Sequence, residues 1–267
     1  MGAPFMVVIP ARYASTRLPG KPLLDIAGKP MIQHVWERVR ACSERPPVIA
    51  TDDTRIEAAA RAFGADVHMT AATHGSGTDR IAEVVGNLRE PEDSIIVNVQ
   101  GDEPLLPGAL VMQVAQLLEG DPAAVMATLS EPITEARDVF DPNVVKVVSD
   151  RDGHALYFSR APIPWNRDDF RTGEASRWPS AQGYHRHLGI YAYRAGFLRT
   201  FTTLPPVRLE KTEALEQLRA LYYGYRIRVA EACVPSGPGV DTPADLERAR
   251  VLLAAHDWQP GPASPAS

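Results

Sequence analysis

Short apolar runs rich in β-branched residues alternate with amphipathic helical patterns through the first half of the chain, and this alternation limits the fold more than any other feature. The runs are Val7 to Pro10, Val48 to Thr51, Ile95 to Val99 and Val125 to Leu129. Continuous apolar runs are typical of strands covered on both faces. Between them, apolar residues recur at helical spacing at Met31, Ile32, Val35 and Val39, and again at Ile81, Val84, Val85 and Leu88. The pattern predicts the α/β class, with a mostly parallel sheet flanked by helices.

The second half of the chain lacks the regular alternation of the first and contains a long polar stretch. Further strands are predicted at Val144 to Ser149, Ala155 to Ser159 and Leu188 to Tyr193, and helices at Lys211 to Leu221 and Pro243 to Ala255. The polar stretch 166–182 is either a mobile loop or an arm covered by a partner. We expect one domain over residues 1–258 with this insert, followed by a disordered tail at 259–267, whose Pro, Gly and Ser residues cannot bury a core.

Composition excludes several classes of protein. A formal net charge of -5 argues against a nucleic-acid binder, which usually carries a basic face. No apolar run approaches the roughly 18 residues of a membrane span, and the short N-terminal run lacks the basic start of a signal peptide. The two cysteines, Cys42 and Cys233, show no metal-ligand spacing and fit free thiols in a reducing compartment. We expect a cytoplasmic protein that binds neither nucleic acid nor a membrane.

A basic loop follows the first predicted strand, where Arg12, Arg17 and Lys21 fall within ten positions. Ligands of α/β sheets sit beyond the carboxyl ends of the strands, and a triphosphate needs several cationic donors around it. The alternative is an ordinary solvated basic turn. Neither a P-loop nor a Gly-x-Gly-x-x-Gly motif is present.

Two acids stand at the ends of other segments. Asp102 follows the strand of residues 95–99 after Gly101, and Asp241 directly precedes the cap of the last helix. Mg²⁺ prefers one or two carboxylates together with substrate phosphates, so the two acids could share one cation. A Gly-Asp turn and an ordinary helix start are the respective structural alternatives.

The segment 74–80 and the strand near residue 190 add polar candidates. Ser76 and Asp79 fit a capping box, while Gly75 and Gly77 let the backbone approach a ligand at a helix start. Arg80 is not explained by capping. His187 and Tyr191 have the same parity and are predicted to face one side of a strand, although strand histidines are usually core or surface residues.

Taken together, these segments resemble the 3-deoxy-manno-octulosonate cytidylyltransferase family. The resemblance rests on residues 8–23 (VIPARYASTRLPGKPL), 98–104 (NVQGDEP), 157–161 (YFSRA), 187–191 (HLGIY), 215–219 (LEQLR) and 239–243 (GVDTP). It covers the chain apart from the tail. It implies a fold of the nucleotide-diphospho-sugar transferase type with a smaller inserted region for dimerisation and sugar binding, a homodimer, and a product used in lipopolysaccharide biosynthesis.

The resemblance also implies roles for the matching residues. Arg12, Arg17, Lys21, Ser76 and Gly77 would bind CTP, and Asp102 and Asp241 would hold Mg²⁺, so that Lys21, Asp102 and Asp241 form the catalytic group. The pocket for 3-deoxy-manno-octulosonate (Kdo) would be lined by Arg80, Gln100, His187, Tyr191, Glu216 and Gln217. Asp79 departs from the glutamate expected there. The role of the insert is left open.

The implied reaction is attack of the sugar's anomeric hydroxyl on the α-phosphorus of CTP, with release of pyrophosphate. A second Mg²⁺ could lower the pKa of the hydroxyl, and His187 is an alternative proton acceptor. Two other functions remain as alternatives. A glycosyltransferase would carry Asp-x-Asp after a strand, where this chain has Gln100 two residues before Asp102. A non-catalytic nucleotide-binding module would not need both acids. The acceptor among Kdo, its amino analogue and other 3-deoxy-ulosonic acids stays open.

Overall fold

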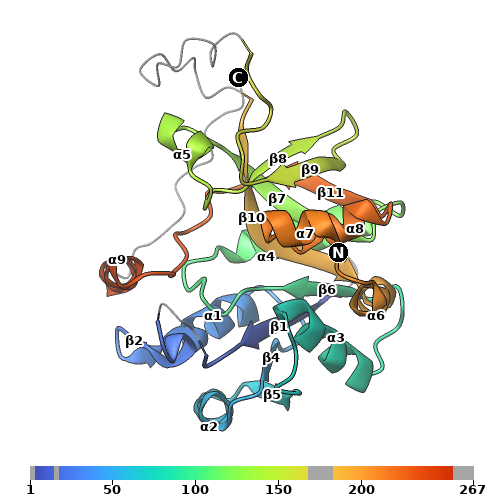
Figure 1. The fold of residues 1–267 in the computed structure, drawn as a ribbon. Helices are drawn as coiled ribbons and strands as arrows, with labels where there is room; N and C mark the ends of the chain where they lie inside the picture. Colours follow the sequence, from blue (N-terminus) through green and yellow to red (C-terminus); the bar gives the residue numbers. More distant parts are fainter. Residues whose placement is uncertain (1–3, 15–17, 168–182, 255–267) are drawn as a thin grey trace.

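The computed structural model describes residues 4–14, 18–167 and 183–254, and within them the strands form one nine-stranded sheet and a two-stranded ribbon, β2–β3 (Figure 1). The order across the sheet is β11-β7-β10-β6-β1-β4-β5, and β8 joins it by pairing with β10 and β9. The strands are β1 (Met6–Ala11), β2 (Asp25–Ile26), β3 (Lys29–Pro30), β4 (Val48–Thr51), β5 (Asp66–Met69), β6 (Ile95–Asn98), β7 (Met126–Pro132), β8 (Lys146–Ser149), β9 (Ala155–Ser159), β10 (His185–Arg194) and β11 (Ile227–Glu231).

The sheet is mixed, and its parallel part carries the functional edge. β1 pairs in parallel with β4 and β6, and β4 pairs in parallel with β5. The long strand β10 runs antiparallel to β6 and β7. The predicted α/β class is confirmed. Because parallel strands end at the same edge, the loops after β1, β4 and β6 lie beside one another.

Helices cover both faces of the sheet. They are η1 (Lys21–Leu23, a 3₁₀ turn), α1 (Met31–Arg40), α2 (Thr54–Ala62), α3 (Gly77–Asn87), α4 (Gly108–Glu119), α5 (Ala136–Phe140), α6 (Ala195–Thr203), α7 (Arg208–Glu213), α8 (Gln217–Tyr222) and α9 (Pro243–Ala254). None of the helices in the described parts of the chain is long and apolar enough to cross a membrane.

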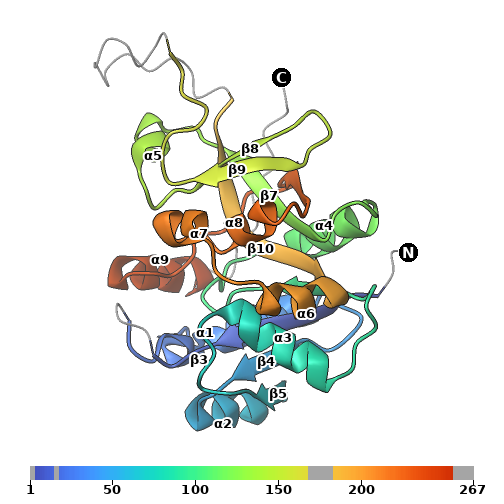
Figure 2. The same cartoon turned by 45° about the vertical axis from the view of Figure 1, so that its right-hand side comes forward.

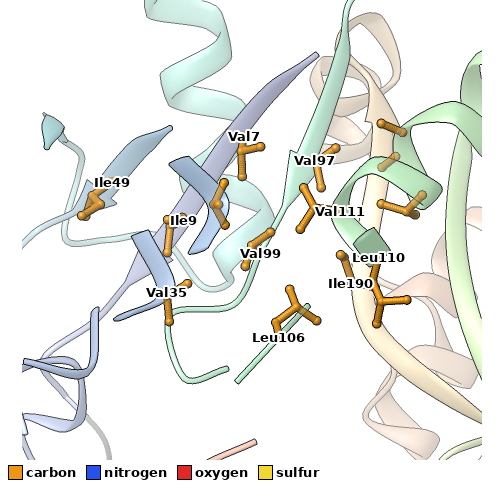
Figure 3. Close-up of a cluster of buried hydrophobic side chains, with 14 of the residues drawn as sticks. Val7, Ile9, Val35, Ile49, Val97, Val99, Leu106, Leu110, Val111 and Ile190 are labelled. Carbon is orange, nitrogen blue, oxygen red and sulfur yellow. The ribbon is translucent and has the colours of Figure 1, made fainter. Parts of the chain in front are cut away.

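Alternation along β1 divides the core into two layers. Val7 and Ile9 point to the face covered by α1 and α4, where Val35 and Val111 pack against them (Figure 3). Met6 and Val8 point to the opposite face, which α3 and α6 cover side by side (Figure 2). Full burial of such side chains stabilises the fold by about 1.5–3 kcal/mol each. Packed helices therefore hold the sheet on both faces, so the strand ends that carry the loops after β1, β4 and β6 are rigidly positioned.

One predicted helix is corrected. The apolar pattern predicts a single helix from Lys211 to Leu221, but α7 ends at Glu213 and α8 begins at Gln217. Ala214 between them has φ +50°, in the left-handed region. Arg160 occupies the carbonyl oxygens of Glu213 and Ala214, which a continuous helix would need for its own hydrogen bonds.

Other predicted boundaries differ by a few residues. The strand predicted from Leu188 starts at His185, because its first residues pair with β7 and β8 although they are polar. Most of the polar insert at 166–182 lies outside the described residues, as does the tail at 259–267.

Candidate active site

A pocket of about 500 Å³ opens where the carboxyl ends of β1 and β6 meet the start of α3. Its walls come from separate segments that the sheet brings together: Pro10 to Arg12, Lys21, Gly75 to Gly77, Gln100 to Asp102, and Asp241. Six of the predicted nucleotide and metal residues therefore share one cavity with Gln100: Arg12, Lys21, Ser76, Gly77, Asp102 and Asp241. This is the position at which α/β sheets bind their ligands.

Lys21 joins the two acids. Its Nζ lies 2.6 Å from Oδ2 of Asp102 and 3.1 Å from Oδ1 of Asp241, and it donates to the carbonyl oxygen of Val240 at 2.7 Å. Burial alone would lower the pKa of Lys21, but the two carboxylates outweigh it and raise that pKa. The lysine is a fixed cation at the floor of the pocket.

The same pair of acids fits a hard divalent cation. Both carboxylates converge on one ammonium group, so a positive charge between them is already accommodated, and carboxylate oxygens are the ligands that Mg²⁺ prefers. Within the described residues there is no group of three or more His, Cys, Asp or Glu side chains that could hold a metal. A cation here would therefore complete its shell with phosphate oxygens and water, as Mg²⁺ commonly does.

One residue of the basic loop, Arg12, is hydrogen-bonded to the loop that precedes α3. Arg12 donates to the carbonyl oxygens of His74 and Gly75 at 3.1 and 3.2 Å, which ties β1 to the loop before α3. A guanidinium has five N–H donors, so this leaves donors for a phosphate. Arg17, the third predicted phosphate ligand, lies outside the described residues.

The start of α3 confirms the predicted capping box. Ser76 accepts from the Asp79 backbone N–H, and Asp79 accepts from the Ser76 N–H, both at 3.1 Å. Gly77 lies against Pro10, whose Cγ would be 3.5 Å from an added Cβ. The structural reading of Ser76 and Asp79 thus holds, while Ser76 and Gly77 still line the pocket.

Glu216 and Gln217 lie at the start of α8. Thr78, at the start of α3, donates to Oε2 of Glu216 at 2.6 Å. Burial raises the pKa of Glu216, and hydrogen bonds from Thr78 and Ser76 act in the opposite direction. The next residue, Gln217, is buried. Glu216 therefore contacts the same short helix start that borders the pocket, although it is separated from Thr78 by 138 positions in the sequence.

His187 and Tyr191 lie on one side of β10, as predicted, with ring centroids 5.2 Å apart. The hydroxyl oxygen of Thr128 lies 3.0 Å from Nε2 of His187 and 2.7 Å from the carbonyl oxygen of Ile190. Burial lowers the pKa of His187 to about 3, so its ring is neutral at pH 7. A ring with so low a pKa is a weak proton acceptor, which argues against His187 as the general base.

This burial predicts a pH effect on stability. The unfolded chain binds a proton at His187 below about pH 6.5, whereas the folded chain does so only near pH 3. The free energy of unfolding therefore decreases as the pH is lowered from about 6.5 to about 3. From pH 7 to pH 5 this residue should cost up to about 2 kcal/mol. Urea unfolding of the wild type and of His187→Gln measures it: the variant should lose less stability over this range. Equal losses in the two proteins would contradict the prediction.

Arg80 lies apart from the other predicted sugar residues. Its side chain is fully buried, its NH1 donates to the Thr70 hydroxyl, and its NH2 lies 3.0 Å from Oδ2 of Asp52. Thr78 and Arg80 are two positions apart, about 200° around a helix, so they face opposite sides of α3. Among the described residues no acceptor takes the Nε–H of Arg80. NH2, although close to Asp52, also has no hydrogen-bond acceptor among these residues. The predicted contact with the sugar carboxylate stays a prediction.

Glu103 directly follows Asp102, and the sequence pattern predicted no role for it. Burial raises its pKa to about 8, and the charges of Asp102 and Asp241 add to the rise. A protonated Glu103 adds no negative charge beside the two acids at neutral pH. Its position after Gly101 and Asp102 in the same motif was the only available signal.

The chain is similar in sequence to known cytidylyltransferases. The cytidylyltransferase family model matches residues 6–227. A 3-deoxy-manno-octulosonate cytidylyltransferase of Pseudomonas fluorescens is 57% identical over 255 residues, covering 96% of this chain and 100% of the relative. One of Nitrosococcus oceani is 54% identical over 253 residues, covering 95% and 98%.

Solved structures extend the comparison. The structure of CMP:2-keto-3-deoxy-manno-octonic acid synthetase complexed with CTP superposes with a TM-score of 0.85 at 45% identity, covering 95% of this chain and 100% of that one. A 4-diphosphocytidyl-2C-methyl-D-erythritol synthase superposes with a TM-score of 0.61 at 15% identity, covering 95% and 100%, and so shares the fold. The chain belongs to the 3-deoxy-manno-octulosonate cytidylyltransferase family.

Proposed function

We propose that the enzyme transfers a cytidylyl group from CTP to Kdo, giving CMP-Kdo and pyrophosphate. The observation that carries this proposal is the cation Lys21 held between Asp102 and Asp241 in a pocket at the sheet edge. The arrangement combines positive charge for phosphates with carboxylates for a divalent cation. Family membership supplies the choice of CTP and Kdo as substrates, and lipopolysaccharide biosynthesis in the cytoplasm as the setting.

The reaction asks mainly for positioning and charge compensation. The anomeric oxygen of Kdo bonds to the α-phosphorus, the bond from that phosphorus to the bridging oxygen breaks, and pyrophosphate leaves with the electron pair. Lys21 and Arg12 offset the negative charge that builds on the leaving group. Mg²⁺ held by Asp102 and Asp241 would add Lewis-acid charge when bound.

The sugar acid would occupy the side of the pocket toward Gln100 and the starts of α3 and α8. Gln100 lines the cavity, and its Nε2 donates to Oδ1 of Asn98 at 3.3 Å, which fixes the amide. Further polar groups for the sugar hydroxyls would come from Glu216, Gln217, His187 and Tyr191. Arg80 is proposed for the carboxylate through its Nε–H, one of its donors without an acceptor among the described residues.

A pyrophosphate-release assay with CTP, Mg²⁺ and a panel of sugar acids tests the function. We expect release only when both CTP and a 3-deoxy-ulosonic acid are present, and Kdo should give the highest kcat/KM. Kdo, its amino analogue and other 3-deoxy-ulosonic acids form the panel. Binding of CTP without release would indicate a nucleotide-binding module, and turnover of a nucleotide sugar would indicate a glycosyltransferase.

We also propose that the enzyme is a homodimer in which the partner covers the region that contains the insert. Leu156 on β9 and Trp165, just before the insert, are each 62% exposed, and a partner subunit seated on this region would cover both side chains. Light scattering should give twice the chain mass of 29.1 kDa. A mass of one chain at working concentration would contradict the dimer.

A further inference from the structure

The end of β9 is bound to the end of α7 through Glu213. The Ser159 hydroxyl donates to Oε1 of Glu213 at 2.7 Å, and the Arg160 backbone N–H donates to Oε2 at 2.9 Å. In return, Nε of Arg160 donates to the carbonyl oxygen of Glu213 at 2.6 Å. We call Ser159, Arg160 and Glu213 the clasp. Both carboxylate oxygens of Glu213 are engaged in it.

Lys146 fixes the other side of the clasp. Its side chain is fully buried, and its Nζ donates to the carbonyl oxygens of Arg160 at 2.7 Å, Val144 at 2.6 Å and Asp141 at 2.9 Å. An ammonium group has three donors, so every one of them is used. The end of β9 is therefore held by β8 and the loop before it, and the clasp transmits that fixed position to α7.

The clasp bears directly on the turn between α7 and α8. Ala214, the residue after Glu213, has φ +50°, a conformation that costs an L-residue roughly 1–2 kcal/mol. Such a conformation persists where surrounding contacts hold it. Arg160 binds the two successive carbonyl oxygens at the start of this turn, those of Glu213 and Ala214.

The turn sets the position of Glu216. Two residues beyond Ala214, Glu216 accepts the 2.6 Å hydrogen bond from Thr78 at the start of α3. A continuous helix through residues 211–221 would rotate and shift Glu216 away from that contact. Glu213 lies at the C-terminal end of α7, where a carboxylate is unfavourable for the helix dipole, so the clasp is what stabilises a charge there.

We propose that Glu213 is a positioning residue for cytidylyl transfer: through the clasp it holds the turn that places Glu216 at the sugar-acid end of the site. Glu213 contacts neither substrate and acts only through Glu216. This inference rests on the proposed function, and within it on the assignment of Glu216 to the sugar acid.

Kinetics of Glu213→Ala, Glu213→Gln and Ser159→Ala test the proposal. With CTP saturating, Glu213→Ala should raise the KM for Kdo roughly tenfold, about the worth of one misplaced charge-assisted hydrogen bond, while the KM for CTP changes less than about twofold. Glu213→Gln and Ser159→Ala each keep part of the clasp and should fall in between. Glu90→Gln is the matched control, because both carboxylate oxygens of Glu90 likewise accept hydrogen bonds, in this case from the guanidinium of Arg45.

Hydrogen exchange over residues 214–221 gives a second measurement that does not depend on turnover. Glu213→Ala should exchange faster there than the wild type, and Glu90→Gln should not. Unchanged exchange, or a lowered Tm in Glu213→Ala with an unchanged KM for Kdo, would overturn the positioning role. If the wild type releases no pyrophosphate from CTP and Kdo, the proposed function fails, and the exchange experiment still decides whether the clasp holds the turn.

Discussion

Replacing Asp102 with asparagine is expected to lower the rate of pyrophosphate release by about 10²–10³-fold at saturating substrates, the usual cost of losing one charge-stabilising group. The amide keeps the shape of the side chain but cannot supply the anion that faces Lys21 at 2.6 Å and would hold Mg²⁺. Asp102 is partly exposed in the pocket, so the variant should fold normally. Mg²⁺-dependent turnover and thermal unfolding measure both expectations.

Asp241→Asn should behave in the same way, and the double variant should lose less than the product of the two single effects, because both acids act on one site. Asp66→Asn is a suitable control, since Asp66 is exposed at the amino end of β5, away from the functional edge. Near-normal turnover in Asp102→Asn or in Asp241→Asn would refute the shared cation.

The sequence predicts best those elements whose signal is local and apolar. The run from Val48 to Thr51 is buried at every position and forms β4 with the predicted bounds. β5 was not predicted because it lies at the edge of the sheet, and of its four residues only Val67 is buried. The Ser76–Asp79 capping box was predicted because its two partners lie within one helical turn.

Contacts between distant positions could be predicted only in part. The rule that parallel strands share a ligand edge placed the basic loop and Asp102 together. It did not indicate that Lys21 would also bind Val240 and Asp241, which lie more than 200 positions away. The break between α7 and α8 was missed for the same reason, since its cause is Arg160 in a different part of the chain.

Arg80 is the site residue for which sequence and structure give different information. The resemblance assigned it to the sugar carboxylate, and the structure pairs it with Asp52 and Thr70. Asp52 belongs to none of the motifs: it is the residue after β4, and nothing in the sequence relates it to α3. An experiment on Arg80 must therefore separate a role in stability from a role in binding.

The stability effect of Arg80→Met is expected to be large. Methionine fills much of the buried volume but leaves Asp52 without its cation, and removing one partner of a buried pair typically costs 3–5 kcal/mol. Asp52 is partly exposed and can be rehydrated, so we expect about 3 kcal/mol in urea unfolding. Adding Asp52→Asn should recover part of this loss, because the two residues are coupled. Strictly additive losses would show that the pair does not stabilise the fold.

The binding effect follows from the Nε–H of Arg80, which no acceptor takes among the described residues. If this donor meets the carboxylate of Kdo, Arg80→Met loses a charge-assisted bond worth about 1.5–3 kcal/mol, and the affinity for Kdo falls roughly tenfold to a hundredfold. CTP affinity should barely change, because the phosphates are assigned to Arg12, Arg17 and Lys21. Asp52→Asn alone serves as the control for lost stability, since it weakens the same pair but keeps the guanidinium. Separate titrations of CTP and Kdo decide the matter: a fall in CTP affinity with Kdo affinity unchanged would assign Arg80 to the nucleotide, and equal affinities in Arg80→Met and Asp52→Asn would make it purely structural.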